Sequence, residues 1–153
     1  ELESACVSFE LRFAQIRDLK KVLRAEAIVY GRLPLMITEN CLVQNETGCR
    51  LDRQGPCVPE DGPCRCGQPN VLVDRTGAAF PLLPAYGHRT EIQNSKPLYL
   101  ADRPEHRRLG LAYARLRFTT ETAEECVSVV QNYLDAAPAA GDFTRGLYER
   151  GVE

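Results

Sequence analysis

The amino-acid sequence predicts an α/β fold that carries a cysteine-rich loop and a small layer of β-hairpins. Three observations lead to this prediction. Residues 5–30 switch between strand and helix periodicity, residues 41–69 hold five cysteines and little periodicity, and residues 70–108 contain short apolar runs between turn residues. With 153 residues, of which 44% are hydrophobic, the chain is long enough to bury a core.

The first segment, residues 1–40, is expected to form a β–α–β unit. Residues 5–11 and 25–30 are typical of strands, and Gly31 ends the second one. The helix between them is indicated by apolar residues at helical spacing: Phe13, Ile16, Leu19 and Leu23. A β–α–β unit has parallel strands and a right-handed crossover. Functional residues gather at the carboxyl ends of such strands, where the stretch from Tyr30 to Cys41 is expected to lie.

The second segment, residues 41–69, is a long loop that cannot form an apolar core. It contains Cys41, Cys49, Cys57, Cys64 and Cys66. In a reducing compartment such a crowded set more often binds a metal ion or an iron–sulfur cluster than forms disulfides, although disulfides and free thiols stay open as alternatives. Without a C-x2-C pair, the spacing does not choose between zinc and a cluster. The remaining two, Cys6 and Cys126, are expected to be small buried apolar side chains.

The last two segments are a β-hairpin region, residues 70–108, and a strand–helix segment with a patterned tail, residues 109–153. A hairpin is predicted over residues 71–82 around the turn Asp74-Arg75-Thr76-Gly77, with further short strands at residues 90–92 and 97–100. Residues 109–118 predict a strand, and the hydroxyl and acidic residues at 119–125 predict the start of a helix. Val127, Val130 and Leu134 give this helix an apolar face.

The composition and the short motifs of the chain exclude several classes of partner and of active site. The formal net charge of −2 gives no overall attraction to nucleic acid or to anionic lipid. No apolar run approaches the roughly 20 residues that cross a bilayer, and residues 1–4 lack the features of a secretion signal, so we expect a cytoplasmic protein without a membrane partner.

The abrupt start, with a strand at residue 5, suggests a piece of a larger protein. With two histidines and no H-E-x-x-H motif, a zinc protease site of the usual kind is excluded, and a Cys41–His88 nucleophile pair is a minor alternative.

Five short motifs follow one another along the chain: Val29-Tyr30-Gly31-Arg32-Leu33-Pro34-Leu35-Met36, Thr38-Glu39-Asn40-Cys41, Asp74-Arg75-Thr76-Gly77, Asn94-Ser95-Lys96-Pro97-Leu98 and Phe143-Thr144-Arg145-Gly146. Together they resemble the C-terminal part of the large bacterial collagenase-like peptidases of family U thirty-two. The resemblance implies a TIM-like barrel, of which this chain would be the last portion, with the remaining barrel domain of the parent protein as its partner.

The resemblance also implies a choice of activities. The family name implies proteolysis, whereas related proteins are similar to iron–sulfur proteins that support prephenate-dependent hydroxylation of RNA or of a quinone precursor. A structural zinc or interaction domain without catalysis is the third alternative. The chain departs from the family pattern, since Tyr30 stands where the family has histidine, Pro34 stands where it has its first cysteine, and His88 stands in place of a cysteine.

Cys41 matches a cluster ligand of the family by its position. The preferred metal ligands are Cys41, Cys49, Cys64 and Cys66, with Cys57 and His88 as substitutes, and the bound group is an iron–sulfur cluster or zinc. Arg32, Glu39 and Asn40 are the candidate substrate-binding residues, for an RNA or peptide substrate. The alternatives are that Arg32 belongs to a solvated basic rim that balances the thiolates and that Asn40 caps a helix or turn.

Overall fold

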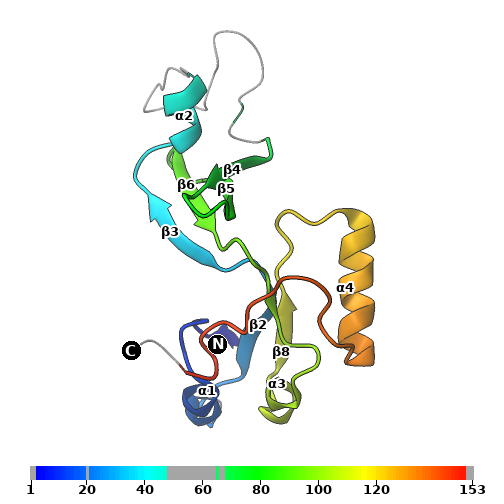
Figure 1. Ribbon diagram of the computed structural model, residues 1–153. Coiled ribbons are helices and arrows are strands. Elements are labelled where there is room, and N and C mark those ends of the chain that lie inside the picture. The colour runs from blue at the N-terminus through cyan, green and yellow to red at the C-terminus, as the bar shows by residue number, and fades with distance from the viewer. Residues whose placement is uncertain (1–2, 20, 48–64, 66–67, 151–153) are drawn as a thin grey trace. The chain divides into compact units, whose positions relative to one another are not determined.

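The computed structural model describes residues 3–19, 21–47, 65 and 68–150 (Figure 1). The chain divides into two compact units. The first unit comprises residues 1–33 and 96–153, and the second comprises residues 34–95. Each unit is built around its own four-stranded sheet.

The sheet of the first unit is organised around its central strand, β2 (Ala25–Gly31). β2 pairs in parallel with β1 (Ala5–Cys6) and with β8 (Tyr113–Leu116), and it pairs antiparallel with β7 (Leu98–Tyr99). The helix α1 (Phe13–Leu19) connects β1 to β2 (Figure 1). The predicted β–α–β unit with parallel strands is therefore confirmed.

The core of the first unit lies against one face of β2. Ala25, Ala27 and Val29 alternate along this strand and are buried, because side chains of a strand point to its two faces in turn. Ile16 of α1 is fully buried in the same cluster. Tyr148 closes it from the C-terminal segment, where its hydroxyl donates to the carbonyl of Ile28 at 2.6 Å.

The helix α4 (Ala123–Asp135) begins as the sequence predicts. The Thr122 hydroxyl accepts from the backbone N–H of Glu125, and the Glu125 carboxylate accepts from the N–H of Thr122, which forms a capping box. The shorter helix α3 (Pro104–Arg108) precedes β8.

The apolar face predicted for α4 is not the face that packs. Val127 and Leu134 are each 71% exposed, and Val130 is also exposed. The helix instead buries Val129, and Tyr133 links it to the sheet. The Tyr133 hydroxyl donates to the carbonyl of Val29 at 2.5 Å and accepts from the N–H of Leu100 at 2.8 Å.

The second unit is an antiparallel sheet in the order β3-β6-β5-β4. Its strands are β3 (Pro34–Thr38), β4 (Asn70–Val73), β5 (Ala79–Ala85) and β6 (Arg89–Gln93), and the helix α2 (Leu42–Thr47) follows β3. The predicted hairpin is confirmed as β4 and β5. In its turn, Asp74 Oδ1 accepts from the N–H groups of Thr76 at 2.7 Å and Ala78 at 3.0 Å.

The described residues thus confirm a mixed α/β fold with two sheets and few helices. Neither sheet closes into a barrel within the described part of the chain. One prediction about the cysteines is wrong, because Cys6 is exposed at the edge of the first sheet and Cys126 is only half-buried. Among the described residues, no helix is long and apolar enough to span a membrane.

Candidate functional site

Cys41 lies in the second unit, between the end of β3 and the start of α2. Its side chain is 6% exposed and packs in a small cluster with Val43 and Leu82. The thiol is therefore held in a largely dry, apolar setting at the point where the chain enters the cysteine-rich segment.

The turn that carries Cys41 is held by two threonines. Thr38 and Thr90 face each other across the β3–β6 pair. The Thr38 hydroxyl donates to the carbonyl of Asn40 at 2.5 Å and accepts from the N–H of Thr90 at 3.3 Å. The Thr90 hydroxyl, which is almost fully buried, accepts from the N–H of Leu42 at 3.0 Å. These bonds fix the backbone on both sides of Cys41.

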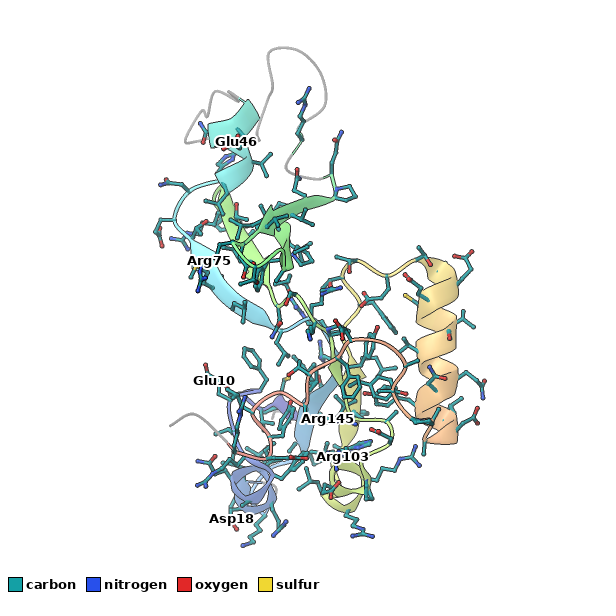
Figure 2. The ribbon with its side chains drawn as sticks, viewed as in Figure 1. Glu10, Asp18, Glu46, Arg75, Arg103 and Arg145 are labelled. Carbon is teal, nitrogen blue, oxygen red and sulfur yellow. The ribbon has the colours of Figure 1, made fainter. Side chains whose placement is uncertain are left out.

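The two stretches that lead into and out of residues 48–64 face each other across one cavity of about 450 Å³. One wall is α2, whose Glu46 is labelled in Figure 2, and the other is β4. The lining residues are Leu42, Val43, Glu46, Asn70, Val71, Leu72, Val73 and Leu82. At the start of β4, the Asn70 side-chain amide donates to the carbonyls of Arg65 at 2.8 Å and Gln68 at 2.7 Å. The helix α2 and the strand β4, which stand on either side of residues 48–64 in the sequence, therefore lie beside each other.

Of the predicted metal ligands, the structure describes Cys41 and His88. Cys49, Cys57, Cys64 and Cys66 lie outside the described residues. His88 is half-buried in the turn before β6, with a positive φ of 58°, two residues from Thr90. Because Thr90 bonds to Leu42, the backbone brings Cys41 and His88 to the same end of the sheet. No group of three or more metal-ligating side chains occurs among the described residues.

The three predicted substrate residues are divided between the units. Glu39 is exposed and forms an ion pair with Arg89 at 2.9 Å, so it steadies the turn before Cys41. Asn40 is exposed, and its backbone carbonyl rather than its side chain bonds to Thr38. Arg32 belongs to the first unit, where its Nε donates to the Thr120 hydroxyl at 3.4 Å.

Arg32 lines a second cavity, of about 430 Å³, which we call the polar cavity. It lies at the carboxyl ends of the parallel strands β2 and β8 and at the first turns of α4. Its lining residues are Tyr30, Arg32, Pro97, Thr120, Glu121, Glu125, Ser128, Val129 and Asp142. The strand pattern of the sequence predicts that Tyr30 and Arg32 lie at this end of the sheet, but it does not reveal the acidic residues. The signal that could have found them is the acidic stretch that directly follows the strand at residues 109–118.

Tyr30 and Glu121, which both line the polar cavity, are joined by a hydrogen bond. The Tyr30 hydroxyl donates to Glu121 Oε1 at 3.3 Å, while Glu121 Oε2 accepts from the N–H groups of Thr119 at 2.7 Å and Thr120 at 3.0 Å. Burial raises the pKa of Tyr30 above its usual range, and the neighbouring Glu121 carboxylate raises it further. Tyr30 therefore stays protonated at neutral pH and acts as a hydrogen-bond donor.

No protein-family model, no curated protein and no solved structure matches the chain.

Proposed function

We propose that the chain is a metal- or iron–sulfur-binding domain of a member of the collagenase-like peptidase family, with Cys41 as its anchored ligand. The observation that carries this proposal is the position of Cys41: its buried thiol lies directly before α2, and α2 leads into the segment that holds the other four clustered cysteines. The proposed ligands are Cys41, Cys49, Cys64 and Cys66, with Cys57 and His88 as substitutes.

The setting of Cys41 fits such a group. Thiolates are soft ligands that suit both zinc and iron–sulfur clusters. The apolar contacts with Val43 and Leu82 keep water away from the sulfur, and the bonds of Thr38 and Thr90 fix the backbone that carries it. When bound, zinc would cross-link the segment, whereas a cluster would add electron transfer. In either case the free energy of binding would stabilise the fold.

We further propose that the first unit is the last portion of a TIM-like barrel, and that the rest of this barrel is its partner. The parallel arrangement of β1, β2 and β8 supports this proposal. So does the exposed apolar face of α4, because a helix of a barrel packs against its neighbours as well as against its own strand. We place the protein in the cytoplasm, where reducing conditions keep thiols available for metal.

The experiment that tests the proposal is analysis of metal and acid-labile sulfide, with an absorbance spectrum, on the full chain purified without oxygen. Iron and sulfide in equal amounts with visible absorbance would support a cluster and would justify assays for prephenate-dependent hydroxylation of RNA or a quinone precursor. One zinc per chain would support the structural alternative and would direct assays for peptide cleavage to the parent protein. A preparation that binds neither metal after reconstitution would refute the proposal.

A further inference from the structure

We propose that the polar cavity binds a primary ammonium or guanidinium group carried on an apolar stem. This is the chemistry of a lysine or arginine side chain of a peptide, and also of a free aliphatic diamine. The cavity belongs entirely to the first unit, whereas Cys41 belongs to the second. The inference therefore does not depend on the proposed metal site.

The charge of the lining favours a cation. Three carboxylates, those of Glu121, Glu125 and Asp142, face a single guanidinium, that of Arg32. Lys96 lies 3.6 Å from the Asp142 carboxylate, but both side chains are well exposed, so this pair is weak. An anion would meet carboxylates that Arg32 alone does not balance. A metal ion is disfavoured because these three carboxylates, like every other group of acidic, histidine or cysteine side chains among the described residues, are not arranged so that they could hold one ion.

The hydrogen bonds that the lining residues already form favour a ligand that donates hydrogen bonds. Glu121 already accepts three hydrogen bonds, from Tyr30, Thr119 and Thr120. Glu125 Oε2 accepts from the N–H of Thr122 at 2.7 Å. Glu125 is an exposed residue, and its other oxygen, Oε1, bonds to no residue in the described part of the chain. A carboxylate can only accept, so the group that pairs with Glu125 must carry N–H or O–H donors.

The walls of the polar cavity account for the apolar stem. Pro97, Val129 and the ring of Tyr30 form its apolar surface, and Tyr30 is 93% buried. The ring is held in place by contacts with Phe118 and Tyr99, at centroid distances of 5.6 and 6.4 Å. A fixed aromatic surface next to carboxylates attracts a cation as well as its alkyl chain. The carboxyl ends of parallel strands are also where open α/β sheets bind their ligands.

The test is titration of the full chain by calorimetry with four cationic probes and with glutarate as an anionic control. Cadaverine and agmatine represent free amines, and acetyl-Gly-Lys-Gly-amide and acetyl-Gly-Arg-Gly-amide represent peptide side chains. The key variant is Glu125→Gln, because glutamine also serves at this position of a capping box and removes only the charge. Glu124→Gln is the matched control, since Glu124 lies in the same turn of α4 but does not line the cavity.

We expect at least one probe to bind with 1:1 stoichiometry, Glu125→Gln to weaken it about tenfold, and Glu124→Gln to leave it within about twofold. Binding of the peptides alone would identify a basic side chain as the ligand, and binding of the diamines alone would identify a free amine. Ser128→Ala, a second substitution in the lining, should also weaken binding. It keeps the proposal testable if Glu125→Gln alters the helix. Equal binding by all variants, tighter binding of glutarate than of cadaverine, or no saturation by any cation up to about 10 mM would overturn the proposal.

Discussion

Gly31 provides a sharp test of how β2 meets β8. Its φ of +115° is a conformation that side-chain-bearing residues rarely adopt, and a Cβ atom at this position would lie 2.0 Å from the carbonyl oxygen of Arg117. In Gly31→Ala, the backbone strain costs about 1–3 kcal/mol. The collision must also push the end of β8 away, which breaks the bond from the Arg117 N–H to the Tyr30 carbonyl and costs about 1 kcal/mol more.

We therefore expect Gly31→Ala to lower the free energy of unfolding by about 2–4 kcal/mol, a large part of the roughly 5–15 kcal/mol of a small domain. Gly141→Ala is the matched control in the same unit, because Gly141 has a φ of +76° but no atom within 4 Å of the added Cβ. This control contains only the backbone strain of about 1–3 kcal/mol and should therefore cost about 1 kcal/mol less than Gly31→Ala. Urea unfolding followed by circular dichroism measures both variants. Equal losses in the two would refute the close approach of β8 to Gly31.

Two further predictions concern the core and the charge pair of the first unit. Tyr133→Phe should lower the free energy of unfolding in urea by about 2–4 kcal/mol, because it leaves a buried carbonyl and a buried N–H unpaired. The control Tyr113→Phe, at a half-exposed site, should lower it by less than about 1 kcal/mol. Equal losses in the two variants would contradict the role of the Tyr133 hydroxyl. The Arg145 guanidinium holds the pKa of Asp102 below its usual range. Because the folded pKa is the lower one, this pair stabilises the fold fully above about pH 4 and is lost as the pH falls below it. Asp102→Asn should therefore flatten the acid limb of stability against pH, and curves that fall in parallel would refute this linkage.

Much of the fold could be predicted from the sequence because its signals are local. The alternation in residues 25–30 reports directly on which side chains of β2 are buried. The Asp74 turn is equally local, since the carboxylate bonds to N–H groups two and four residues further on. The capping box at Thr122 is set by residues three positions apart. Each of these features needs no knowledge of distant contacts.

The features that the sequence missed depend on distant contacts. Tyr30 and Glu121 are 91 residues apart, and only the parallel pairing of β2 with β8 joins them. The apolar periodicity of α4 correctly marked a helix but not its packed face. Tyr133 and Val129 meet the sheet instead, because the Tyr133 hydroxyl satisfies two buried backbone groups there. Periodicity alone cannot show which of two apolar stripes meets the sheet.

For the candidate metal site, the sequence predicted ligand types, and the structure adds the placement of Cys41 and His88. Cysteine spacing cannot show that α2 and β4 meet at one cavity, because this depends on the order of strands in the second sheet. It also cannot show that Arg32 falls in a different unit from Glu39 and Asn40.

The most direct test of the central claim is the metal content of Cys41→Ala compared with that of Cys126→Ala, each measured on the anaerobically reconstituted chain of 153 residues. Cys126 is half-buried on α4 in the other unit, so it controls for the loss of any one thiol. We predict that Cys126→Ala holds as much metal per chain as the unaltered protein and that Cys41→Ala loses most of it. Full metal content in Cys41→Ala, with its circular dichroism unchanged, would contradict the assignment of Cys41 as the anchored ligand.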